Sequence, residues 1–363
     1  MSVHDSFEKE FDKQLKSFSK VNIMVVGGTG VGKSSLINKV FGKELAKTGS
    51  GEPITKGIIS YTYEGFPAVI YDTEGYEIIN GSVDNSNFNN NVLREIKRLK
   101  EKELKDQIHL FWYCISATGH RITNYDLNNI KELNSLGVDL AVVITQCDNE
   151  PIDDSGNGLT SAAFKNQLLK ESIDSRVFET VSLGDDTLQL SDLLTWSSER
   201  LTDDDLRSAF IGAQKLNIDL KNKSADIAIG LAVASASAAA GANPFPLSDS
   251  LMLMPIQMTL ALRIANIYGF TSLGESATAL LKTQVISLLG KQLATSLTKF
   301  IPIFGQIVNG AVAGSLTLAL GYGLKTAYKN AYVDYLETGK EPEWVKLFSK
   351  LDIVSLYNQY KTK

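Results

Sequence analysis

The sequence predicts an α/β domain, with a mixed and mostly parallel sheet flanked by helices, followed by an all-α helical domain. Short apolar runs rich in β-branched residues alternate with helical patterns up to about residue 203, which is typical of a parallel sheet with crossover helices. Beyond that point only helical patterns follow. We therefore expect an N-terminal amphipathic helix at 1–20, the α/β domain at 21–203 and the helical domain at 204–363.

The first twenty residues predict a helix with one apolar stripe. Apolar side chains recur there every three or four positions, at Phe7, Phe11, Leu15 and Phe18. We expect this stripe to pack on the C-terminal helices. The alternative is insertion into a lipid surface, because the other face of the helix mixes lysines with acids.

Composition narrows the class of protein. The chain has 363 residues, of which 44% are hydrophobic and 21% charged, so it is globular rather than disordered. A formal net charge of −5 gives no electrostatic footprint for nucleic acid, and we expect no such partner. The two cysteines, Cys114 and Cys147, are too few for a disulfide framework. The start shows no apolar run behind a basic end, so we expect a cytoplasmic protein.

The stretch VNIMVVGGTGVGKSSLINKVFG, residues 21–42, carries the strongest chemical signal. A β-branched run leads into the Walker A spacing G-x-x-x-x-G-K-[ST], and a helical pattern follows. Glycines let backbone amides approach phosphate oxygens, and the new helix points its positive end at them. Lys33 supplies a charge to the terminal phosphates, and the Ser34 hydroxyl suits Mg²⁺. The predicted phosphate-binding set is Gly27, Gly28, Thr29, Gly30, Val31, Gly32, Lys33, Ser34 and Ser35.

Two later strand ends indicate which nucleotide is bound. PAVIYDTEG ends in a D-x-x-G motif, in which Asp72 reaches magnesium through water and the Gly75 amide senses the terminal phosphate. DLAVVITQCD ends in Thr145, Gln146 and Asp148. The Asp148 carboxylate can accept both the ring N–H and the amino group of guanine, which adenine cannot offer. The sequence therefore predicts GTP or GDP with Mg²⁺.

In order and position these motifs resemble those of the translation-factor-related (TRAFAC-class) GTPases, and more narrowly the Era-like branch. The resemblance implies a P-loop GTPase fold and hydrolysis of GTP to GDP and phosphate. It also implies that Thr55 completes the magnesium shell, with an ordinary solvated loop threonine as the alternative. Ser182 and Leu183 resemble the loop whose amides contact the guanine oxygen. One departure is Gln146, where the family usually has lysine, although glutamine can still lie against the base.

The catalytic residue of many related GTPases is missing. A glutamine that orients the attacking water usually follows D-x-x-G, whereas this chain has Tyr76. The chain thus resembles hydrophobically substituted GTPases, and we expect slow intrinsic turnover. Thr29, Glu74 and Arg121 are the candidates for the missing role. By similarity to dynamins and septins, we expect a homodimer through the GTPase domains in the GTP state, with Arg121 as an arginine finger or, alternatively, as an ordinary surface ion-pair partner.

The helical half contains a long uncharged stretch, FIPIFGQIVNGAVAGSLTLALGYGL at 300–324. It is long enough to cross a bilayer, but Pro302, Gln306 and Asn309 interrupt its first half, and a buried bundle helix can look equally apolar. Its G-x-x-x-G motif favours close helix contact in either setting. We expect a helical hairpin that hides its apolar faces and presents them to a membrane when the nucleotide changes.

Residues from about 225 to 335 resemble a bacterial helical family of unknown function found behind Era-like GTPases, and more loosely the immunity-related GTPases. The leading expectation is a slow GTPase whose nucleotide state controls self-association and membrane or partner engagement, peripheral at the inner face of the cytoplasmic membrane. One alternative is a GTP-dependent assembly factor acting on RNA or the ribosome. Another is a nucleotide-gated scaffold with negligible hydrolysis.

Overall fold

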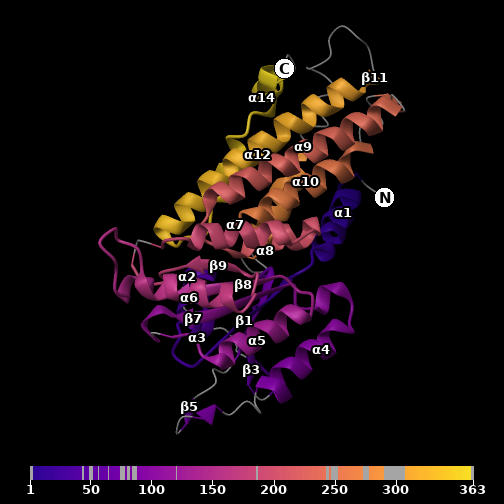
Figure 1. The fold of residues 1–363 in the computed structure, drawn as a ribbon. Coiled ribbons are helices and arrows are strands. Elements are labelled where there is room, and N and C mark those ends of the chain that lie inside the picture. Colours follow the sequence, from indigo (N-terminus) through magenta and orange to yellow (C-terminus); the bar gives the residue numbers. More distant parts are fainter. Residues whose placement is uncertain are drawn as a thin grey trace. The chain divides into compact units, whose positions relative to one another are not determined.

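A computed structural model describes the chain in two compact units (Figure 1). One unit is 19–217, and the other joins 1–18 to 218–363. The described residues are 3–360 except 43–44, 49–51, 56, 64, 74–77, 80–81, 84–87, 120, 185–186, 243–244, 247–251, 273–277 and 290–306.

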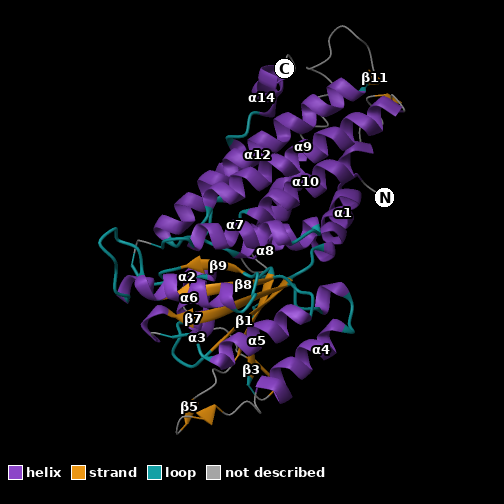
Figure 2. Ribbon diagram, in the orientation of Figure 1, coloured by secondary structure: helices purple, strands orange, loops and turns teal. Residues whose placement is uncertain are grey.

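The first unit is built on a seven-stranded sheet in the order β2-β3-β4-β1-β7-β8-β9 (Figure 2). Strands β4, β1, β7, β8 and β9 are parallel to one another, while β2 and β3 run antiparallel at one edge. This confirms the predicted mixed, mostly parallel sheet. The strands are β1 (Val21–Gly27), β2 (Glu52–Thr55), β3 (Ile58–Tyr61), β4 (Ala68–Thr73), β7 (Leu110–Ser116), β8 (Leu140–Thr145) and β9 (Arg176–Glu179), with a separate hairpin of β5 (Ile78–Ile79) and β6 (Ser82–Val83).

Helices cover both faces of this sheet (Figure 2). Thr123 begins α5 with a reciprocal capping box, in which its hydroxyl accepts from Asp126 N and the Asp126 carboxylate accepts from Thr123 N. The helices of this unit are α2 (Lys33–Phe41), α3 (Leu45–Thr48), α4 (Arg94–Lys100), α5 (Asn124–Ser135), α6 (Leu159–Lys170), α7 (Leu190–Arg200) and α8 (Asp204–Ala213).

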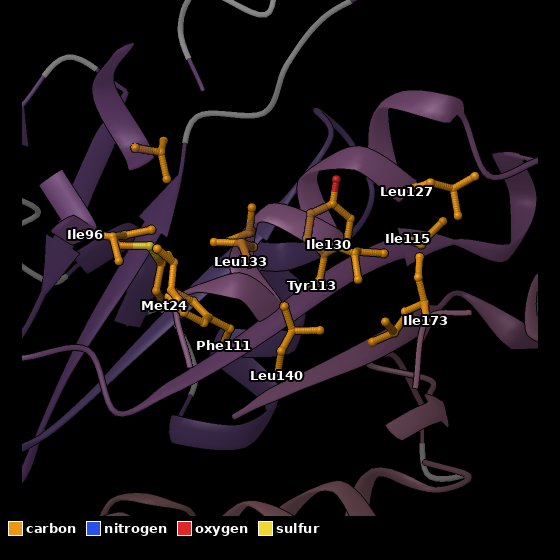
Figure 3. Packing of buried hydrophobic residues seen from close by; sticks show 14 of the residues in the cluster. Met24, Ile96, Phe111, Tyr113, Ile115, Leu127, Ile130, Leu133, Leu140 and Ile173 are labelled. Carbon is orange, nitrogen blue, oxygen red and sulfur yellow. The ribbon is translucent and has the colours of Figure 1, made fainter. Parts of the chain in front are cut away.

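The central strand β7 is buried on both sides, because successive side chains point to opposite faces. Phe111, Tyr113 and Ile115 enter one apolar cluster, shown in Figure 3. On the other face the Trp112 ring stacks on Phe41, with ring centroids 5.8 Å apart. The two faces of β7 therefore pack against different apolar side chains.

Helix α8 lies in the sheet unit, whereas the predicted boundary at 203 assigned it to the helical domain. The division by contacts falls between Asn217 and Ile218. The physical reason is packing: Phe210 of α8 is fully buried and meets Trp112 edge-on, with ring centroids 6.3 Å apart.

The second unit is a helical bundle. Helix α1 packs on α10 and buries Phe7 and Phe11, as its apolar stripe predicts. The Lys282 ammonium adds an ion pair to Asp12 of α1 at 2.9 Å. The described helices are α1 (Val3–Ser17), α9 (Ile218–Ala242), α10 (Met254–Ile267), an unlabelled helix Thr278–Leu289, α12 (Gly310–Thr338), α13 (Trp344–Ser349) and α14 (Ile353–Tyr360), with a two-stranded ladder of β10 (Phe245–Pro246) and β11 (Ile307–Val308).

Helices α9 and α12 lie side by side, and glycines of α12 allow their close approach (Figure 1). A Cβ at Gly310 would lie 2.7 Å from the Ser237 carbonyl oxygen, and one at Gly321 would lie 2.7 Å from Ile229 Cγ1. A Cβ at Gly314 would run into Ser237 Oγ. The G-x-x-x-G motif thus makes a helix–helix contact inside the bundle, which we call the α9–α12 interface.

The uncharged stretch 300–324 does not form one helix in the described part of the chain. Its first seven residues lie outside the described ranges, and α12 begins only after Asn309, whose side chain accepts from Val312 N at 3.1 Å. Among the described helices, α9 is the one long and apolar enough to cross a membrane, with 33% of its most apolar window buried. By length and composition alone, a core helix of a soluble protein would qualify as well.

Candidate nucleotide-binding site

The predicted site residues meet at the carboxyl ends of the parallel strands. Strands β1, β4, β7, β8 and β9 run parallel, so their carboxyl ends lie on the same side of the sheet. Ligands of open α/β sheets bind on that side. Val25 is opposite Asp72, and Ser116 is opposite Thr145. The glycine-rich loop after β1, the D-x-x-G strand and the base-motif strand therefore converge.

The loop after β1 takes conformations that require glycine. Gly27 has a φ of 149°, and a Cβ there would run into the Cys114 carbonyl oxygen. Gly30 and Gly32 have φ values of 77° and 92°, in the left-handed region. Gly32 is also the N-cap of α2. The helix therefore starts directly at the loop, with its free amides available to an anion.

Lys33 is buried inside the loop that it follows. Its ammonium donates to Gly27 O at 3.0 Å and to Gly28 O at 2.8 Å, and the residue is only 8% exposed. Burial lowers the pKa of Lys33, and the nearby Asp72 carboxylate partly opposes this. A phosphate oxygen would be a stronger partner than the two neutral carbonyls.

Asp72 and Ser34 form the magnesium end of the site. Ser34 Oγ donates to Asp72 Oδ2 at 3.3 Å, whereas Asp72 Oδ1 is buried and has no hydrogen-bond partner in the described structure. Burial raises the pKa of Asp72, against the opposing effects of Lys33 and Ser34. An unpartnered buried oxygen costs about 1–3 kcal/mol, and hard cations such as Mg²⁺ favour oxygen ligands. The donor set thus fits Mg²⁺.

The base-motif strand is tied to the phosphate loop. Thr145 Oγ1 donates to the Val31 carbonyl oxygen. Gln146 follows in the left-handed region, with φ 59°, and its Oε1 accepts from the hydroxyls of Ser116 and Thr118. Asp148 is exposed at the same strand end, where its carboxylate is open to a base.

The loop after β9 contributes the fainter predicted contacts. Ser182 Oγ is buried without a hydrogen-bond partner in the described structure, while Leu183 is 74% exposed. Lys39 of α2 donates to Gly184 O at 2.7 Å and joins this loop to the helix that begins at the phosphate loop.

The structure describes only some of the catalytic candidates. Thr29 and Arg121 are exposed, Thr29 in the phosphate loop and Arg121 between β7 and α5. Glu74, Gly75 and Tyr76 lie outside the described residues. Thr55 ends β2, but its side chain is not described. The remaining phosphate-loop residue, Ser35, is exposed in the first turn of α2.

The predicted site lacks Ser116, Thr118 and Lys39, although the structure places them there. Ser116 is the last residue of a buried strand next to the base-motif strand, and Thr118 follows it. That position at a carboxyl end is the signal that could have found them. Lys39 carried no such signal, because a lysine in the last turn of a helix is usually solvated.

Comparisons with known proteins agree with this geometry. Residues 22–146 match the family model described as "50S ribosome-binding GTPase". Septin CDC11 of Candida albicans is 28% identical over 163 residues, covering 38% of this chain and 40% of the septin. Neuronal-specific septin-3 of Mus musculus is 27% identical over 196 residues, covering 47% of this chain and 53% of the septin. The chain thus spans about half the length of these relatives, or less.

Two solved structures match part of the chain with low similarity scores. A probable GTP-binding protein engB is 16% identical with a TM-score of 0.35, covering 50% of this chain and 98% of that one. Toc33 from Arabidopsis thaliana, in a dimerization-deficient mutant form, is 16% identical with a TM-score of 0.37, covering 58% of this chain and 92% of that one. The family match spans the phosphate loop, Asp72 and Gln146, and this part of the chain is a P-loop GTPase domain.

Proposed function

We propose that the chain binds GTP and Mg²⁺, hydrolyses GTP slowly to GDP and phosphate, and uses its nucleotide state to control self-association and membrane or partner engagement of the helical unit. The observation that carries the proposal is the pair of buried opposite charges, Lys33 and Asp72, at the carboxyl ends of the parallel strands. Each lacks a strong partner that a phosphate or a magnesium ion would supply.

Each residue has a distinct task in this proposal. Lys33 and the amides at the start of α2 hold the phosphates. Ser34 and Asp72, with Thr55, would hold Mg²⁺, which neutralises phosphate charge when bound. Asp148 selects guanine. Because Tyr76 replaces the usual glutamine, water must be positioned by another group, and Thr29, Glu74 and Arg121 are the candidates.

Nucleotide binding is tested by retention of radiolabelled GTP on a filter. Lys33→Ala should reduce affinity at least about a hundredfold, because the charge on the phosphates is lost. Asp148→Asn should lose guanine preference and gain xanthine nucleotides, since the new amide N–H can donate to the oxygen at position 2 of xanthine. Circular dichroism serves as the folding control. Unchanged GTP affinity in both variants contradicts the site assignment.

Self-association is proposed from the resemblance to septins and dynamins and from the exposure of Arg121 between β7 and α5. A dimer that completes its own catalytic site should show specific activity that rises with protein concentration. Arg121→Ala should flatten that rise and leave GTP affinity intact. Activity proportional to concentration over a wide range, in both proteins, refutes the dimer.

Membrane engagement is proposed for α9, whose outer face carries the exposed side chains of Ile227 and Leu231. The test is flotation with anionic liposomes, without nucleotide, with GDP and with a non-hydrolysable GTP analogue. Ile227→Asp with Leu231→Asp should abolish nucleotide-dependent flotation. The matched control is Leu169→Asp, because Leu169 is at least as exposed but belongs to the sheet unit. Absence of flotation in all three states argues for a protein partner instead.

A GTP-dependent assembly factor is the second candidate, favoured by the family description that includes 50S ribosome binding. The net charge of −5 opposes it. Co-sedimentation with large ribosomal subunits in moderate salt, dependent on GTP, would decide for this role. Negligible hydrolysis over long incubation would decide for a nucleotide-gated scaffold.

The finer kinship is also a proposal. The order of the motifs supports placement near the Era-like and immunity-related GTPases. We also propose a location in the cytoplasm, peripheral at the inner face of the cytoplasmic membrane. Fractionation of cells into soluble and membrane parts tests the location. Removal of the protein from membranes by high salt or carbonate would distinguish peripheral binding from a permanent span.

A further inference from the structure

Three side chains at the carboxyl ends of β7 and β8 form a hydrogen-bonded cluster. Ser116 Oγ donates to Gln146 Oε1 at 2.6 Å, and Thr118 Oγ1 lies 2.9 Å from the same oxygen. The two hydroxyl oxygens are 2.7 Å apart. Ser116 is buried, and Gln146 is half-buried.

In the described structure the carbonyl oxygen of the Gln146 carboxamide is turned toward the two hydroxyls. Ser116 Oγ accepts from Thr118 N at 3.2 Å and donates its own hydrogen to Gln146 Oε1. Both hydroxyls therefore face the carbonyl oxygen of the amide. The two N–H donors on Nε2 remain for another acceptor, and a carboxamide held at its oxygen cannot rotate freely.

The Nε2 atom lies over the phosphate loop. It is 3.7 Å from the point that a Cβ on Gly32 would occupy. Thr145, the residue before Gln146, donates to Val31 of the same loop, and Asp148, two residues after Gln146, is exposed. The N–H donors thus lie next to the phosphate loop.

We propose that Ser116 and Thr118 are positioning residues that hold the Gln146 amide with its N–H donors toward an oxygen of the bound nucleotide. This inference rests on the proposed function and concerns the regulation of the same site, namely how fast nucleotide leaves it. The two hydroxyls complement a carbonyl oxygen, so the three residues act as a unit in which a neutral amide replaces the lysine of related proteins. Preorganisation of this kind raises affinity without a new contact.

The test measures the dissociation rate of radiolabelled GDP from the full chain. The double variant Ser116→Ala, Thr118→Val should release GDP about tenfold faster, which corresponds to the loss of about one good hydrogen bond. Thr118→Ser should restore most of the retention that Thr118→Val loses, because the hydroxyl returns. Gln146→Glu keeps the acceptor for both hydroxyls but removes the N–H donors, so it should release GDP faster while its unfolding temperature stays unchanged.

A coupling experiment separates positioning from a merely structural role. In a Gln146→Leu background, the double variant should add no further change to the GDP dissociation rate, because the amide that it positions is gone. An additive effect in that background overturns the inference, and so does wild-type retention by Gln146→Glu. If the wild-type chain binds no guanine nucleotide, the proposed function fails, which is a distinct result from GDP binding that is insensitive to these variants.

Discussion

Glycine has different uses in the two units. In the phosphate loop, Gly27, Gly30 and Gly32 adopt positive φ values, and the room beside Gly30 is open. In the α9–α12 interface, Gly310 and Gly321 are helical, and a neighbouring helix fills the room. The first use is conformational and leaves space for a ligand, whereas the second is steric and removes space. Alanine substitutions in the two units should therefore differ in how much stability they cost and in whether they impair nucleotide binding.

Gly27→Ala should have the largest effect, because the new Cβ would meet the Cys114 backbone carbonyl, which cannot move away without disturbing β7. The positive φ adds strain. We expect a loss of about 3–4 kcal/mol of stability in the sheet unit and complete loss of nucleotide binding. Thermal unfolding and GTP retention measure the two. A stable variant would show that the strand register tolerates displacement.

Gly321→Ala should destabilise the helical unit by about 1–3 kcal/mol, because its Cβ would overlap the Ile229 side chain. GTP affinity should be unchanged. The matched control is Gly230→Ala in α9, where a Cβ meets nothing, so better helix propensity should add about 0.5–1 kcal/mol. Equal shifts of the unfolding midpoint in the two variants would contradict close packing of α9 on α12.

Gly30→Ala should cost about 1–2 kcal/mol, because its φ of 77° is unfavourable for a residue with a Cβ but no atom stands in the way. The cost falls on the loop conformation that holds phosphate, so we expect GTP affinity to fall about tenfold with the fold intact. Isothermal titration calorimetry checks this. A stability loss as large as that of Gly27→Ala would contradict the view that backbone strain at Gly30 costs less than the steric overlap at Gly27.

Asp72→Asn should give the smallest effect, a gain of up to about 1 kcal/mol at neutral pH without Mg²⁺. The folded-state pKa of Asp72 is raised, so the folded state binds its proton more tightly than the unfolded state does. The wild-type chain therefore loses stability as the pH rises from the unfolded-state pKa of Asp72 through its folded-state pKa. At a pH below both pKa values this loss is absent. The advantage of Asp72→Asn, measured by urea unfolding across pH, should therefore vanish in acid. Added Mg²⁺ and GDP should reverse it, because only the wild-type carboxylate attracts the ion through its bound water.

Local patterns could predict most of the sheet unit. The alternation along β7 specifies which side chains face each cluster, and the spacing from Gly27 to Ser34 specifies a loop geometry that glycine alone permits. Periodicity could not predict the cluster at Gln146, because short hydroxyl side chains at a strand end follow no repeat, and only their place at a carboxyl end indicates the site. Their role depends on the neighbouring strand.

The helical half was less predictable for a different reason. Periodicity shows that a segment is helical but does not identify what the helix packs against. The pattern of α8 therefore placed it in the helical domain, whereas its Phe210 packs on Trp112 of the sheet unit. A charge-free run does not reveal where a helix begins. Asn309 caps α12 within the uncharged stretch, and the most apolar long helix in the described chain is α9.

The position of Trp112 provides an optical reporter. The indole lies between Phe41, at the end of the helix that begins with Lys33, and Phe210 of α8, and its Nε1 donates to Ser197 Oγ at 3.1 Å. A shift of α2 on nucleotide binding would alter the stacking and the polarity around one buried fluorophore. Emission from a chain in which Trp196 and Trp344 are replaced by phenylalanine would then follow the phosphate loop in real time, without any attached dye.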